Sequence, residues 1–184
     1  MPLRIEDYAM IGDCQSAALV GRDGSIDWLC WPRFDSPACF AALLGTSENG
    51  RWLIAPVSAS PNVRRRYLTD TLILETEIQT ETGTATVVDF MPATDGKADL
   101  VRVVFGRSGE VKFRTELVIR FGYGAIVPWV SRAEDDTLHA VAGPERIVLH
   151  TPVALYGEDL KTVGEFVVST GQSVPFVLSY GLSF

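Results

Sequence analysis

Residues 111–121 read VKFRTELVIRF, and the character of their side chains alternates along the chain. The odd-numbered positions are apolar apart from one threonine. The even-numbered positions carry, apart from one valine, the charged residues Lys112, Arg114, Glu116 and Arg120. A helix would scatter these residues around its circumference, whereas a strand with one buried face sorts them into two rows. The alternation therefore predicts a half-buried β-strand over this stretch.

Turn residues bracket similar runs along the rest of the chain. Asp23-Gly24 separates AALVG from SIDWLCW, and this dipeptide favours a short hairpin because glycine accepts a positive φ. Thr82-Gly83, Ser108-Gly109 and Thr170-Gly171 separate further pairs of runs. Roughly a dozen strand candidates follow one another at the spacing of an antiparallel sandwich. The predicted fold is all-β, a large antiparallel β-sandwich.

Only one segment has the pattern of a helix. Ser36 suits the N-cap, Pro37 the first helical position and Gly45 the position after the last turn. These signals predict one short helix near residues 37–44. It follows a predicted strand from Ser25 to Trp31 and a proline-containing corner over residues 32–35.

Composition narrows the class of protein. The chain has 184 residues, enough for one domain with a substantial core, and we expect a single domain over residues 1–184. A net charge of −7 opposes binding to nucleic acid, and no stretch is apolar for long enough to predict a membrane span. The start, MPLRIEDYAMIGD, carries acidic side chains and is unlike a signal peptide, so we expect a cytoplasmic protein.

The cysteines predict free thiols. They stand at positions 14, 30 and 39, an odd number without a close pair, which matches neither a disulfide framework nor a zinc site. We therefore expect reduced cysteines, no bound metal and no cofactor.

Familiar catalytic motifs do not occur in the sequence, which lacks the G-x-S-x-G, Walker, G-x-G-x-x-G and H-E-x-x-H patterns. His139 and His150 have no obvious third metal ligand near them in sequence, and we interpret them as surface or half-buried sheet residues. Glu75 and Glu77 have the spacing of a glycosidase carboxylate pair, but the solvated face of an alternating strand accounts for them fully. No residue is predicted to be catalytic.

The stretch Ser25–Gly45, SIDWLCWPRFDSPACFAALLG, combines many aromatic and charged side chains. Aromatic rings stack on the C–H faces of sugars, and tryptophan and arginine also anchor protein interfaces. Three interpretations stay open: a structural corner braced by an Arg–Asp pair, an interface with another domain, or direct contact with a ligand. The candidate residues for the interface or the sugar rim are Asp27, Trp28, Trp31, Arg33, Phe34 and Asp35.

Several stretches also resemble a known family. Residues 5–45, IEDYAMIGDCQSAALVGRDGSIDWLCWPRFDSPACFAALLG, are similar to the opening of bacterial and archaeal family-fifteen glycoside hydrolases, the glucoamylase and trehalase group. The similarity continues in order through GRWLIAP, RRYLTDTLILETE, VVDFMP, LVIRFGYGAIVPWV and AGPERIVL. It implies an N-terminal β-sandwich of the supersandwich type. In the family, a helical linker and an (α/α)₆ barrel with two catalytic glutamates follow that domain.

No glutamate of this chain matches the catalytic pair of the family. The resemblance therefore implies a non-catalytic N-terminal domain that docks on the catalytic barrel of an inverting glucoamylase- or trehalase-like enzyme and stabilises it. The corner over residues 31–35 would face that barrel, and the isolated domain would associate with itself through the bare surface. The resemblance leaves open whether the parent enzyme prefers trehalose or maltose-type glucans.

Two other functions remain as alternatives. The sandwich would be a stand-alone module that binds an oligosaccharide through its aromatic corner, or, less favoured, a mutarotase-like sugar enzyme that transfers protons with His and Glu. The sequence stops at Phe184 directly after a predicted strand, with no polar tail, which we interpret as the sign of one domain of a longer protein or of a terminus that docks on a partner.

Overall fold

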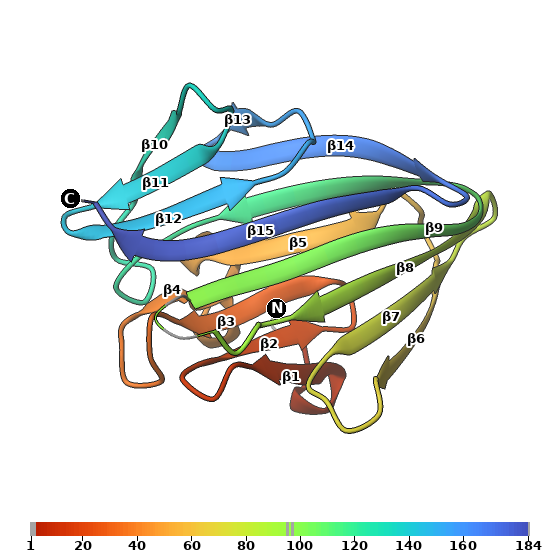
Figure 1. Cartoon of the computed structure of the whole chain (residues 1–184), viewed down its shortest axis with the longest axis horizontal. Helices are drawn as coiled ribbons and strands as arrows, with labels where there is room; N and C mark the ends of the chain where they lie inside the picture. The colour runs from red at the N-terminus through yellow and green to blue at the C-terminus, as the bar shows by residue number, and fades with distance from the viewer. Residues whose placement is uncertain (1–2, 95, 97, 184) are drawn as a thin grey trace.

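The computed structural model describes residues 3–94, 96 and 98–183 and is built almost entirely of antiparallel strands (Figure 1). Within that range it has three one-turn 3₁₀-helices: η1 (Ile5–Asp7), η2 (Ala42–Leu44) and η3 (Ser47–Asn49). The strands are β1 (Tyr8–Gly12), β2 (Ala17–Gly21), β3 (Ser25–Cys30), β4 (Ala38–Phe40), β5 (Arg51–Pro56), β6 (Asn62–Tyr67), β7 (Leu74–Gln79), β8 (Gly83–Phe90), β9 (Ala98–Val118), β10 (Trp129–Arg132), β11 (Leu138–Ala142), β12 (Glu145–His150), β13 (Tyr156–Glu158), β14 (Lys161–Ser169) and β15 (Ser173–Leu182).

The strands form one hydrogen-bonded network folded into two layers. Layer A contains β1–β5, β13, β14 and the second half of β9, and layer B contains β6–β8, β10–β12, β15 and the first half of β9. β9 joins them, because residues 98–109 pair with β8 and β15 whereas residues 110–118 pair with β5 and β14. Figure 1 shows β9 turning over at one end of the molecule. The predicted all-β sandwich is confirmed.

Glycines allow this reversal of β9. Gly109 has φ +60°, a conformation that residues with a side chain rarely adopt. Gly106 lies against the end of β14, where an added Cβ would stand 2.0 Å from the carbonyl oxygen of Ser169. The sequence indicated a turn between two strands at Ser108-Gly109. The structure instead keeps the strand pairing through this point, so the turn is a bend within one long strand.

The alternation over residues 111–121 produces the inner face of layer A. Val111, Phe113 and Leu117 are buried, whereas Lys112 is exposed, as the pattern predicts. The strand ends at Val118, three residues before the end of the predicted stretch. Arg120 was expected on the polar face but is buried, and it donates to the carbonyl oxygens of Ile119 at 2.8 Å and Leu160 at 3.3 Å.

A buried arginine ties the two layers together. Arg102 of layer B is fully buried, and its Nε donates to Asp89 Oδ1 at 2.8 Å. Its Nη1 donates to the carbonyl oxygen of Trp52 and its Nη2 to that of Gly24, each at 2.9 Å, and both acceptors belong to layer A. The guanidinium carbon also lies 5.3 Å from the Trp52 ring centroid. One charged side chain therefore fixes how the layers are stacked.

The prediction of a short helix near residues 37–44 is wrong. This segment contains strand β4, which pairs with β3, and the single 3₁₀ turn η2. A two-turn helix has little stability of its own. Pairing instead places Phe40 opposite Leu29, and both side chains are fully buried. The preceding strand is confirmed and ends at Cys30, one residue earlier than predicted.

Candidate interaction surfaces

The corner after β3 exposes only part of the predicted aromatic surface. Phe34 is 62% exposed, and Arg33 Nε lies 3.0 Å from Asp35 Oδ1 in a solvent-exposed ion pair. Trp31 is 1% exposed, and its ring centroid lies 6.4 Å from that of Tyr180. Because the Trp31 ring is enclosed in the core, it offers no face to a sugar or to a partner domain.

The other two candidates have structural contacts. Asp27 is buried, accepts a hydrogen bond from the Tyr8 hydroxyl at 2.6 Å, and accepts a second from the Ser25 hydroxyl. It thereby joins β3 to β1. Trp28 is half-buried, with its ring centroid 6.1 Å from that of Tyr123. The structure thus brings Arg33, Phe34 and Asp35 together on the surface and places Asp27 and Trp31 inside.

The contact between Tyr8 and Asp27 predicts a loss of stability in alkali. Burial, followed by the hydrogen bond to Asp27, raises the pKa of Tyr8 well above its usual value. An unfolded tyrosine loses its proton near pH ~10, while folded Tyr8 keeps it. The contribution of this contact is therefore complete below pH ~10 and declines as the pH rises further towards the folded-state pKa.

We expect the stability advantage of the wild type over Tyr8→Phe to shrink above pH ~10. Urea unfolding of both proteins across this range measures it. An advantage that stays constant, or grows, as the pH rises would contradict the assignment.

The carboxylates with glycosidase-like spacing belong to a charged strand pair. Glu75 Oε2 lies 2.9 Å from Arg66 Nη2, and Glu77 stands opposite Arg64 in the pairing of β6 with β7. A solvated sheet face with arginine neighbours accounts for both glutamates, as the sequence indicated. Neither stands as an acid opposite a free base.

The histidines do not form a site. His139 is half-buried, stands opposite Val148, and lies 3.0 Å from the Thr137 hydroxyl, while His150 is exposed. Over residues 3–94, 96 and 98–183, no group of three His, Cys, Asp or Glu side chains is placed to hold a metal ion. No helix in the described part of the chain is long and apolar enough to cross a membrane.

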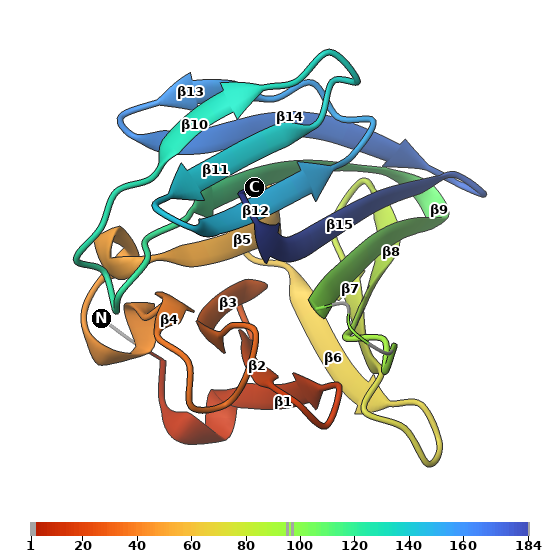
Figure 2. The same ribbon diagram turned by 60° about the vertical axis from the view of Figure 1, so that its left-hand side comes forward.

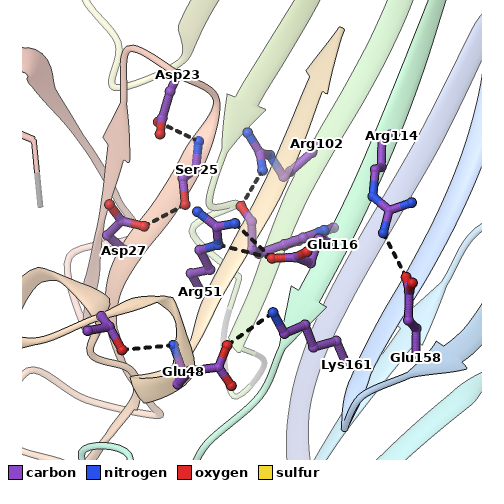
Figure 3. A network of polar contacts seen from close by, with 12 residues as sticks. Asp23, Ser25, Asp27, Glu48, Arg51, Arg102, Arg114, Glu116, Glu158 and Lys161 are labelled. Atoms are coloured by element: carbon purple, nitrogen blue, oxygen red, sulfur yellow. Dashed lines mark hydrogen bonds and ion pairs between the residues drawn. The ribbon is translucent and has the colours of Figure 1, made fainter. Parts of the chain in front are cut away.

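A cleft of about 570 Å³ opens between strand β10 of layer B and the β13–β14 hairpin of layer A. Its mouth exposes Trp129, Leu160 and Tyr156, of which Trp129 is 79% exposed. Two of its charged groups are held in ion pairs. Lys161 Nζ lies 3.0 Å from Glu48 Oε1, and Glu158 Oε2 lies 2.8 Å from Arg114 Nη2 (Figure 3). The cleft therefore presents apolar surface more than free hydrogen-bonding groups.

Sequence reasoning missed Trp129. The stretch LVIRFGYGAIVPWV supported the family resemblance, but it has no strict alternation that separates inner from outer side chains. All four residues of the short edge strand β10 are exposed, so no local pattern marks its tryptophan as a surface residue. Only the position of β10 at the edge of layer B does so.

Comparisons with known proteins find one family and several relatives. The family described as "Trehalase-like, N-terminal" matches residues 1–179. A trehalase of Mycolicibacterium smegmatis is 44% identical over 85 residues, which are 46% of this chain and 13% of that protein. Trehalase 1 of Sulfolobus acidocaldarius is 34% identical over 133 residues, 72% of this chain and 22% of the relative. A trehalase of Thermoplasma volcanium is 29% identical over 135 residues, again 22% of its length. The chain thus spans between 13% and 22% of these three relatives.

Proposed function

Because the chain belongs to the trehalase-like N-terminal family, we propose that it is the non-catalytic N-terminal domain of a trehalase-type glycoside hydrolase. In this proposal, residues 1–184 form a single domain that docks on a catalytic (α/α)₆ barrel and stabilises it. The barrel supplies the catalytic glutamates and the sugar pocket. The proposed location is the cytoplasm, where Cys14, Cys30 and Cys39 would stay as free thiols.

The match to the family over residues 1–179 carries the proposal. The relatives with the name trehalase extend far beyond the matched region, since it covers 13–22% of their length. The surroundings of Glu75 and Glu77 give additional support, because both side chains lie on a solvated strand face with arginine neighbours.

Purified protein is expected to release no glucose from trehalose or maltose. Hydrolysis with inversion needs a carboxylic acid and a carboxylate on opposite sides of the bond, and the glutamates of β7 lie on one face of one strand. A coupled glucose assay at high protein concentration measures this. Glucose release that disappears in Glu77→Gln, with the fold intact, would overturn the proposal.

The alternative of a sugar-binding module predicts a different result. Phe34 and Trp129 are exposed aromatic residues, and each gives a specific reason to test this function. We expect titration calorimetry with trehalose and maltotetraose to detect no binding tighter than about 1 mM, because Lys161 and Glu158 of the cleft are held in ion pairs with Glu48 and Arg114. Tighter binding that is lost in Trp129→Ala or Phe34→Ala would favour the module.

A further inference from the structure

The outer face of layer A carries charged side chains that pair with one another. Arg51 Nη2 lies 2.7 Å from Glu116 Oε1, and Arg114 Nη2 lies 2.8 Å from Glu158 Oε2 (Figure 3). These groups stand on β5, β9 and β13, so the pairs extend across the layer. A sheet face covered by partly exposed ion pairs is suited to water.

The outer face of layer B is apolar at its centre. In the first half of β9, residues 100, 102 and 104 are buried between the layers, so residues 101 and 103 point outward. In the register of the sheet, β8 contributes one outward residue opposite each of them, and β15 contributes another. The resulting outer apolar face consists of Val88, Phe90, Val101, Val103, Pro175 and Val177.

Polar side chains border this face on several sides. Glu75 stands opposite Val88 on β7, His150 stands opposite Val177 on β12, and Asp99 stands opposite Ser179. All six residues of the outer apolar face are half-buried or exposed in this chain. An apolar centre with a polar rim is the usual anatomy of a protein interface. Valine and proline side chains offer no hydrogen bond to a sugar hydroxyl, so this chemistry fits an apolar protein segment.

Strand β15 runs through the outer apolar face and ends on the same layer. β15 contributes Pro175 and Val177 to its centre, and Leu182 follows five residues after Val177, roughly 17 Å along the strand. Figure 2 shows this end of β15 beside β12. The relatives extend far beyond the matched region. A polypeptide that continued from β15 would leave the domain from layer B, within about 17 Å of this face along the strand.

Resting on the proposed function, we propose that the outer apolar face of layer B docks an apolar segment of the polypeptide that follows this domain in trehalase-type proteins. The charged outer face of layer A stays in solvent. Docking covers valine, proline and phenylalanine side chains that this chain alone leaves in contact with water.

A pair of matched substitutions tests the proposal. Val103→Lys places a charge at the centre of the outer apolar face, and Val167→Lys places the same charge on layer A, opposite Lys112. Val167 is 49% exposed, and an outward lysine keeps its ammonium group in water on either face. Circular dichroism and thermal unfolding of the isolated chain check that both variants retain the fold.

The variants are then compared in a fusion to the remainder of the M. smegmatis trehalase, in place of that enzyme's own matched region. The wild-type fusion is expected to hydrolyse trehalose and to unfold in one transition. Val103→Lys should split the unfolding into two transitions, while Val167→Lys keeps one.

Each other outcome has a definite meaning. Two independent transitions in the wild-type fusion would contradict the proposed function itself. A single transition in the wild type, Val103→Lys and Val167→Lys alike would leave the proposed function standing and overturn this inference. Light scattering of the isolated chain adds a third case. If Val103→Lys abolishes a dimer but leaves the fusion unchanged, the occupant of this face is a second copy of the chain, and the inference is wrong.

Discussion

Arg102→Leu is expected to lower the free energy of unfolding by about 3–5 kcal/mol, a large part of the stability of a domain of this size. The change removes the cation beside Asp89, whose side chain is 1% exposed, and leaves a buried carboxylate without its charged partner. It also leaves the carbonyl oxygens of Trp52 and Gly24 without the donors that reach them from layer B. Urea unfolding measured by tryptophan fluorescence gives the difference.

The double variant Asp89→Leu with Arg102→Leu separates the energy of the ion pair from the energy of side-chain packing. Replacing both members of a buried ion pair by apolar residues is often neutral, so the double variant should recover most of the lost stability. A coupling of this kind is read from the double-mutant cycle. If Arg102→Leu lowers the free energy of unfolding by less than about 1 kcal/mol, the contacts of Arg102 between the layers contribute little to stability and the interpretation is wrong.

Gly106→Ala is expected to cost more than about 3 kcal/mol or to prevent folding, since its Cβ would stand 2.0 Å from the carbonyl oxygen of Ser169. The obstructing atom belongs to the backbone of the β14–β15 hairpin, which cannot move away without breaking its pairing with β9. The same substitution would therefore push β9 away from the end of β14, at the point where the chain passes between the layers. Thermal unfolding of the purified variant measures the effect.

Gly157→Ala is the matched control. A Cβ added at Gly157 has nothing within 4 Å, and its φ lies outside the left-handed region. This variant should stay within about 0.5 kcal/mol of the wild type. Equal stability of Gly106→Ala and Gly157→Ala would show that the end of β14 accommodates a methyl group, against the close approach described above.

Local alternation was sufficient to predict most of the strands. The pattern over residues 111–121 predicted which side chains of β9 lie inside, and Asp23-Gly24 predicted the hairpin between β2 and β3. The helix prediction near residues 37–44 failed because it used capping residues alone. Pairing of Phe40 with Leu29 outweighed that weak local preference.

The candidate surface was harder to predict. The pattern placed Trp31 and Leu29 on the same strand face, but it did not say that this face meets the core near Tyr180. In the run DLVRVVFG each of the two alternating rows has one charged residue among apolar ones, so the alternation does not say which row is buried. The row that contains Arg102 lies between the layers, because Arg102 finds its hydrogen-bond partners there, the Asp89 carboxylate and the carbonyl oxygen of Trp52.

The sequence by itself determined the all-β class, turns such as Asp23-Gly24, and the family, because side-chain alternation and short motifs are local properties of the chain. The tertiary structure alone decided that Trp31 is buried, that Trp129 is exposed to solvent and that layer B has the apolar outer face. Those facts depend on pairing between segments far apart in sequence, such as β9 with β14 and β15. A strand's own pattern separates its two faces but does not specify what each face will meet.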